Sequence, residues 1–267
     1  MASELPISTI QEAIEDIVEF LEVSQRVVVL TGAGASTESG IPDFRSADGI
    51  WRRYPPGTYQ DFISKPEARR RYWELRRTLG SQVRNARPNP THYALAALEQ
   101  MGKLSGIITQ NFDGLHQDAG VSPERVIELH GTSRWAACTL CGVRSPMSEL
   151  QQRIEAGEED PQCALCGGYL KAATILFGQP VPRAELDRAI ALTNQSDLFL
   201  VIGSSLRVSP ASRLPWLAVE RGTPLIIINR EPTPLDRRAD LVLSANAGET
   251  MARVMARLRE KQEGETA

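Results

Sequence analysis

The chain has 267 residues, of which 42% are hydrophobic and 24% charged, a composition typical of a globular protein large enough to bury a substantial core. Its 30 Lys and Arg residues against 33 Asp and Glu residues give a net charge of -3, which argues against nucleic acid as a direct ligand. The first residues show no basic stretch followed by an apolar one, and no segment has the length of a membrane span. We therefore expect a cytoplasmic protein without a membrane partner.

The first predicted elements are a helix and a buried strand. Ile10, Ile14, Ile17 and Leu21 recur at helical spacing and predict an amphipathic helix. The continuous apolar run at residues 27–30 then predicts a strand that is buried on both faces.

A glycine-rich turn follows that strand directly. Gly32 and Gly34 lack the Cβ atoms that would keep an anion away from the backbone N–H groups and from the start of a following helix. This pattern suits the pyrophosphate of a nucleotide such as NAD, although Thr37 stands where a dinucleotide fingerprint has its third glycine. A plain structural turn is the alternative interpretation of the two glycines alone.

The turn continues into residues 40–45, Gly-Ile-Pro-Asp-Phe-Arg. Phe44 offers an aromatic lid, and Asp43 and Arg45 place opposite charges beside the expected phosphates. Residues 46–64 are irregular and lead into a basic helix, so we expect a helical insert that belongs to the cofactor loop.

Strands and helices alternate through the rest of the chain. Short apolar runs predict strands at residues 106–109, 126–129, 198–202 and 225–228. Helical patterns predict helices that begin after Pro90 and that cover residues 184–193, 211–221 and 250–260. This alternation favours a doubly wound, Rossmann-like parallel α/β sheet with its ligand at the carboxyl ends of the strands.

Residues that suit ligand binding lie at or just after the ends of several of these strands. The residues in question are Gly32, Gln110, His130, Gly203 and Asn229. Because the carboxyl ends of parallel strands meet at one edge of a sheet, we expect these residues to converge on a single crevice.

Four cysteines form two Cys-x-x-Cys pairs, Cys138 with Cys141 and Cys163 with Cys166, separated by 21 residues. This spacing is typical of a zinc ribbon, and four thiolates close the coordination shell, so the sequence predicts one structural Zn²⁺ in an inserted module at residues 135–171. Disulfides or free thiols are the alternative, and a reducing compartment disfavours the disulfides. A zinc knuckle that binds a protein or a nucleic acid is the minority interpretation.

Three stretches together carry a family resemblance: residues 31–45, residues 109–116 (Thr-Gln-Asn-Phe-Asp-Gly-Leu-His) and residues 126–131, which end in His130 and Gly131. Their order resembles that of the sirtuins, the NAD-dependent protein-lysine deacylases. The resemblance implies an NAD-binding Rossmann-like domain made of residues 1–45, 87–134 and 172–267. The helical insert would then be residues 46–86, and the zinc module residues 135–171.

The resemblance also implies a mechanism. The pyrophosphate of NAD lies on the Gly32-Ala33-Gly34 loop, Ile41 and Asp113 hold the nicotinamide carboxamide, and Gln110 and Asn111 position the ribose and a water. The acyl-lysine oxygen attacks the ribose carbon C1′ as nicotinamide leaves, and His130 then removes a proton from a ribose hydroxyl. The products are free lysine, nicotinamide and O-acyl-ADP-ribose.

Of the three histidines, only His130 is expected to act as a general base, with Asn111 as the second catalytic residue. His92 and His116 are expected to pack or to cap helices. The full set of expected cofactor contacts is Gly32, Ala33, Gly34, Ile41, Asp43, Phe44, Arg45, Gln110, Asn111, Asp113, Gly203, Ser204, Ser205, Asn229, Glu231 and Ala247, the last six lying toward the adenosine half.

The substrate is expected to be an acyl-lysine protein or peptide that binds as an extended strand between residues 177–179 and residues 208–210. The sequence departs from the commonest sirtuin pattern at Ala35, Phe112 and Gln179. Nothing in the sequence specifies an oligomeric state.

Acyl-chain preference depends on a Tyr-x-x-Arg pair in sirtuins that remove acidic acyl groups. The corresponding stretch here is residues 73–76, with Trp73 in place of the tyrosine and Tyr72 out of register by one. This favours an acetyl or another uncharged acyl group. A longer or acidic acyl group, mono-ADP-ribosyl transfer from the same NAD site, a nicotinamide dehydrogenase and a non-catalytic zinc-ribbon module remain as alternatives.

Overall fold

The structure is a computed structural model that describes residues 7–46 and 49–266. The ends of the predicted first domain at residues 1–6 and 267, and residues 47–48 of the predicted insert, lie outside the described residues. The core is a parallel sheet of six strands in the order β3-β2-β1-β7-β8-β9. The strands are β1 (Val27–Thr31), β2 (Leu104–Thr109), β3 (Val126–Glu128), β7 (Leu198–Ile202), β8 (Leu225–Ile228) and β9 (Leu241–Leu243).

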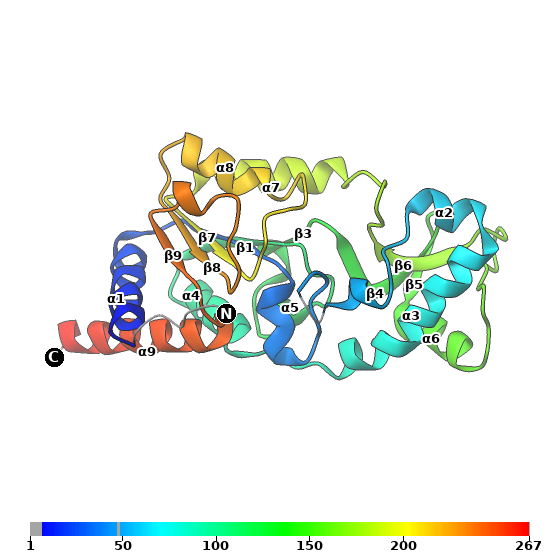
Figure 1. Ribbon diagram of the computed structural model, residues 1–267, viewed down its shortest axis with the longest axis horizontal. Coiled ribbons are helices and arrows are strands. Elements are labelled where there is room, and N and C mark those ends of the chain that lie inside the picture. Colours follow the sequence, from blue (N-terminus) through cyan, green and yellow to red (C-terminus); the bar gives the residue numbers. More distant parts are fainter. Residues whose placement is uncertain (1–6, 47–48, 267) are drawn as a thin grey trace.

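Helices cover both faces of this sheet, as Figure 1 shows. Alternate residues of a strand point to opposite faces, so Val27 and Val29 of β1 join the core under α1 (Ile7–Val23), α4 (Pro90–Gln100) and α9 (Ala247–Thr266). Val28 and Leu30 join the core under α7 (Arg183–Gln195) and α8 (Arg213–Glu220). Burial on both faces explains why these strands are continuous apolar runs.

The neighbouring strands β1 and β7 form the centre of the sheet, where the strand order reverses. Ligands of doubly wound sheets bind beyond the carboxyl ends of the strands at this reversal. The residues that follow β1 and β7 are the glycine-rich turn at Gly32 and the turn at Gly203. The predicted Rossmann-like class is therefore confirmed.

A small lobe lies at the other end of the molecule (Figure 1). Its sheet has the order β5-β4-β6 and is antiparallel. It consists of β4 (Gly131–Cys138), β5 (Arg144–Pro146) and β6 (Leu170–Thr174), with α2 (Tyr59–Ser64), α3 (Pro66–Asn85) and α6 (Met147–Glu155) beside them. The predicted domain boundaries stay a prediction. The packing supports one small lobe made from both inserted segments, because Trp73 of α3 shares a core with Leu150 and Ile154 of α6.

Several details differ from the sequence-based expectations. The helix expected after the glycine-rich turn is a 3-10 helix, η1 (Ala33–Ser39), and α9 is longer than the predicted 250–260. The short strand β9 was not predicted. The remaining short elements are η2 (Ile50–Arg52), α5 (Leu115–Asp118), η3 (Pro123–Arg125) and η4 (Asp236–Arg238). Within the described residues, none of the helices combines the length and apolar character needed to cross a membrane.

Candidate active site between the two lobes

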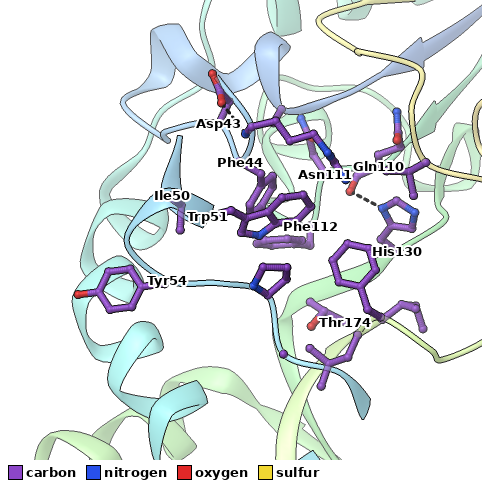
Figure 2. Close-up of a pocket in the computed structure, with 18 of the residues that line it drawn as sticks. Asp43, Phe44, Ile50, Trp51, Tyr54, Gln110, Asn111, Phe112, His130 and Thr174 are labelled. Carbon is purple, nitrogen blue, oxygen red and sulfur yellow. Dashed lines mark hydrogen bonds between the residues drawn. The ribbon is translucent and has the colours of Figure 1, made fainter. Parts of the chain in front are cut away.

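A cavity of about 1080 Å³ lies between the sheet lobe and the small lobe. Its walls come from the turns after β1, β2, β7 and β8, from α3, and from the segment after β6. Except for Asp113 and Ala247, every predicted catalytic and cofactor residue lines this cavity. Figure 2 shows Asp43, Phe44, Gln110, Asn111 and His130 around it.

The glycines of the turn after β1 allow a close backbone approach. A Cβ atom added at Gly34 would lie 2.7 Å from Gly203 Cα, and one added at Gly32 would lie 2.7 Å from Gly203 O. Gly203 itself has a φ of 64°, a left-handed conformation that favours glycine. These glycines are therefore required by contact between the turns after β1 and β7, a reason that the sequence analysis did not give.

Gln110 and Asn111 are held by hydrogen bonds that cross between strand ends. Gln110 Nε2 donates to Ser204 Oγ at 2.7 Å. Asn111 Nδ2 donates to Gly32 O at 3.0 Å and to Ser36 Oγ at 3.0 Å. Because both amide hydrogens of Asn111 are used, its Oδ1 is the atom left to accept from a ligand in the cavity.

His130 follows β3 and is partly buried. Its Nδ1 lies 3.1 Å from Gln110 O (Figure 2). A carbonyl oxygen only accepts, so Nδ1 carries the hydrogen and Nε2 keeps its lone pair. Burial and then the Arg45 charge lower the pKa of His130, against the Gln110 carbonyl, which raises it. The imidazole is therefore neutral near pH 7, as a general base requires.

Asp113 and Ala247 lie outside this cavity. Asp113 Oδ2 accepts from Ser36 Oγ at 2.8 Å, and Asp113 Oδ1 accepts from Leu115 N at 3.0 Å. Ala247 lines a smaller cavity next to Gly34 and Asn229. The assignment of both residues to cofactor binding stays a prediction, and Asp113 acts here by holding Ser36, which in turn contacts Asn111.

The other two histidines are structural. Asn89 N donates to His92 Nδ1 at 3.2 Å, which completes the capping box of α4. His116 is buried, and its Nε2 lies 2.9 Å from Thr31 Oγ1. Burial lowers the pKa of His92 to about 4 and holds that of His116 well below 6.5. The expected packing and capping roles agree with these contacts.

An aromatic wall closes one side of the cavity, as Figure 2 shows for Phe44, Trp51 and Phe112. The ring centroid of Phe44 lies 5.4 Å from that of Trp51 and 6.0 Å from that of Phe112, while Trp51 lies 5.3 Å from Phe177. The Arg45 guanidinium lies 4.0 Å from the centre of the Trp51 ring. Phe44 is predicted from the sequence to line the site, whereas Trp51 is not, because the segment around Trp51 has no periodic pattern.

The structure reverses the expected roles of Tyr72 and Trp73. Trp73 is fully buried in the core of the small lobe, whereas Tyr72 and Arg76 line the cavity. Residues four apart share one helix face, and Arg76 Nε donates to Tyr72 OH at 3.2 Å. α3 thus turns Tyr72 rather than Trp73 toward the cavity, at a spacing of four rather than three from Arg76, and the acyl-chain preference stays a prediction.

The four cysteines gather at one end of the small lobe, with all sulfur atoms within 4.8 Å of one another. Cys138 Sγ lies 3.5 Å from Cys166 Sγ, and Cys141 Sγ lies 3.9 Å from Cys163 Sγ. Four sulfurs at about 2.3 Å from a tetrahedral zinc ion lie about 3.8 Å apart. All four cysteines are free of disulfides, so the donor set fits one closed structural Zn²⁺ site.

The turns after β1 and β7, at the strand reversal of a parallel sheet, and a neutral histidine after β3 define a Rossmann-like α/β protein. Its crevice suits a nucleotide, and its separate small lobe carries a cysteine cluster that fits zinc. The Sir2 family profile matches residues 32–210 of the chain. The chain therefore belongs to the Sir2 family, the sirtuins.

The chain aligns with nearly the whole length of several named relatives. The chain is 47% identical over 229 residues to NAD-dependent protein deacetylase 2 of Streptomyces coelicolor, a match that spans 84% of this chain and 94% of the relative. It is 42% identical to the NAD-dependent protein deacetylase of Thermodesulfovibrio yellowstonii, over 91% of this chain and 94% of the relative.

Solved structures of Sir2 enzymes share the fold. One, from a study of the mechanism and regulation of Sir2 enzymes, superposes with a TM-score of 0.85 at 40% identity and covers 94% of this chain and 99% of its own. Another, a Sir2 enzyme with a p53 peptide and NAD⁺, superposes with a TM-score of 0.82 at 33% identity and covers 95% and 99% of the two chains.

Proposed function

We propose that this protein is an NAD-dependent protein-lysine deacetylase. The observation that carries the proposal is the orientation of His130, whose Nε2 is free while its Nδ1 hydrogen is fixed on Gln110 O. The relatives named as NAD-dependent protein deacetylases support the same activity. A peptide substrate is supported by the Sir2 structure that holds a p53 peptide with NAD⁺.

The residues of the cavity have separate roles in this proposal. Backbone N–H groups of the turn at Gly32–Gly34 hold the pyrophosphate of NAD, and Asn111 Oδ1 accepts a hydrogen bond on the ribose side. Bound NAD supplies an electrophilic ribose carbon from which nicotinamide leaves. Nε2 of His130 accepts the proton that acyl transfer releases. The aromatic wall of Phe44 and Trp51 excludes water from the reacting atoms.

The test is turnover of an acetyl-lysine peptide with and without NAD, followed by mass spectrometry. We expect deacetylated peptide, nicotinamide and O-acetyl-ADP-ribose in equal amounts, and no product without NAD. His130→Ala should lower turnover by about 10²- to 10⁴-fold, the usual contribution of a general base, while the peptide and NAD still bind. Labelled ADP-ribose retained on protein, without deacetylated peptide, would instead indicate mono-ADP-ribosyl transfer.

A second candidate is a preference for longer or acidic acyl groups, which the position of Tyr72 and Arg76 favours. Both line the cavity, and Arg76 has no carboxylate partner within ion-pair distance among the described residues. If this candidate is right, a succinyl-lysine peptide is turned over faster than the acetyl peptide, and Arg76→Met removes that difference. Binding of the substrate as an extended strand, the absence of a nucleic-acid ligand and the cytoplasmic location remain predictions from the sequence.

A further inference from the structure

The positive charge of this protein is concentrated in one segment. Residues 49–88 contain ten Arg and Lys residues against three acidic ones, whereas the rest of the chain contains twenty basic residues against thirty acidic ones. A protein of net charge -3 thus carries a strongly basic segment beside its cavity. A charge asymmetry of this kind indicates an acidic partner at that place rather than over the whole surface.

Most of these basic residues lie on α3, which presents three different faces. Arg69 and Trp73 point into the small lobe, where Arg69 donates to Asp160 at 2.8 Å. Arg71 lies on the face that lines the cavity. Arg70 and Arg77 are exposed and do not line the cavity. The helix therefore places one exposed arginine, Arg71, at the cavity and others on its outer side.

A second exposed arginine lines the cavity from the opposite lobe. Arg207 lies in the segment after β7, next to Val208 at the expected substrate edge. Its charge, after burial, is the second factor that lowers the pKa of Arg45, so the two guanidinium groups lie near one another. Arg71 from the small lobe and Arg207 from the sheet lobe thus stand on either side of the space between the lobes.

Neither arginine is neutralised by the protein. Four carboxylates line the cavity. Asp61 pairs with Lys65 at 2.7 Å and Asp43 faces Arg230 at 3.7 Å. Glu67, one helical turn before Arg71, and Glu231 also line it, and neither forms an ion pair with Arg71 or Arg207 among the residues described. Within the described part of the chain, no carboxylate lies within 4.0 Å of Arg71 or Arg207. Arg71 and Arg207 line the same cavity as His130 without forming an ion pair to any described residue, so their charges are available to a substrate segment that enters with the acyl-lysine.

We propose that this cavity selects acyl-lysine segments in which acidic residues flank the modified lysine, with Arg71 and Arg207 contacting the two flanks. The inference rests on the proposed deacetylase function and specifies its substrate class. A polypeptide is favoured over a nucleic acid because the two arginines face the catalytic cavity, while Arg69 and Arg84 on other faces of α3 are already paired with Asp160 and Glu155.

The test compares three acetyl-lysine peptides of one length whose flanking residues are acidic, neutral or basic. At low salt, we expect kcat/KM for the acidic peptide to exceed that for the neutral peptide by about three- to tenfold, the effect of one or two exposed ion pairs. The preference should shrink as ionic strength rises. If none of the three peptides is turned over, the proposed function fails; if all are turned over equally, only the charge preference fails.

Variants then assign the preference to residues. Arg71→Glu and Arg207→Glu should each reduce the ratio of acidic to neutral peptide, and together should reverse it in favour of the basic peptide. Arg70→Glu, on the outer side of the same helix, is the matched control and should keep the ratio within about twofold of the wild type, because exposed distant charges are screened. A purely structural effect would slow all three peptides alike.

Two outcomes would overturn the proposal. One is a wild-type preference for acidic peptides that survives the double variant. The other is equal turnover of the three peptides together with binding of a single-stranded DNA oligonucleotide that Arg70→Glu weakens, which would assign the basic helix to a nucleic acid.

Discussion

The imidazole of His130 has one nitrogen fixed on Gln110 O at 3.1 Å and the other free. Burial, followed by the Arg45 charge, keeps its pKa below the ordinary 6.5. The free-enzyme base is therefore neutral through the physiological range, and protons compete for Nε2 only at more acidic pH. Protonation of His130 should therefore control the pH dependence of the reaction on the acid side.

We predict that kcat/KM for an acetyl-lysine peptide falls on the acid side with a midpoint below pH 6.5. Because the pKa is lowered, activity is retained above that midpoint and lost as the pH decreases through it. The measurement is kcat/KM between pH 4.5 and 8, a profile that reports the free enzyme. An acid limb with its midpoint at or above pH 6.5 would show that another group controls the reaction.

Individual residues were predictable to different degrees. His130, Gln110 and Gly203 could be found because each directly follows a buried strand, and strand ends converge. The choice between Tyr72 and Trp73 could not be made from sequence, because α3 packs one face on the small lobe and another on the cavity. Apolar and aromatic side chains then occupy both faces, and periodicity does not say which one meets the ligand.

The small lobe depends on the four cysteines for its shape. Cys138 ends β4, and Cys163 packs in the same core as Trp73 and Leu150. This core is small, and a metal that binds only the folded lobe adds its binding free energy to the stability of the lobe. Because α3 of this lobe forms a wall of the cavity, unfolding of the lobe after loss of the metal should also disrupt the active site.

We predict about one zinc ion per chain and loss of deacetylase activity when a strong chelator removes it. The tryptophan emission of the protein should shift to longer wavelength as the buried environment of Trp73 opens, and added Zn²⁺ should restore both signals. Cys138→Ser should show the same defects without chelator, since a hydroxyl replaces one thiolate. Full activity in a metal-free protein would rule out a structural role for the site.

Secondary structure was predicted correctly where burial on both faces requires an apolar segment. The strands at the centre of the sheet are buried on both faces, so each is a continuous apolar run that sequence alone identifies. The edge strand β9 has only three residues, too few to form a pattern. The helix after the glycine-rich turn was predicted without its type, and its 3-10 form, η1, goes with close contact between this turn and Gly203.

At the scale of the whole molecule, His92 and His116 link stability to pH. Their rings lie 4.9 Å apart beneath the turn that holds Asn111. The pKa of His92 is lowered to about 4 and that of His116 lies well below 6.5, in both cases mainly through burial. Between pH 6.5 and about 4 the unfolded chain binds protons that the folded chain does not, so stability decreases as pH decreases.

We predict that the free energy of unfolding falls by about 2 kcal/mol between pH 7.5 and pH 5 through His92, at about 1.4 kcal/mol per pH unit below 6.5, and that His116 adds to this fall. Urea unfolding followed by circular dichroism at both pH values measures the fall. His92→Gln and His116→Gln should each lower stability at pH 7.5 yet lose less of it on acidification. Both variants keep the four cysteines, so acid release of zinc contributes equally and cancels in the comparison. A fall that is the same size in the variants as in the wild type would place the acid sensitivity elsewhere.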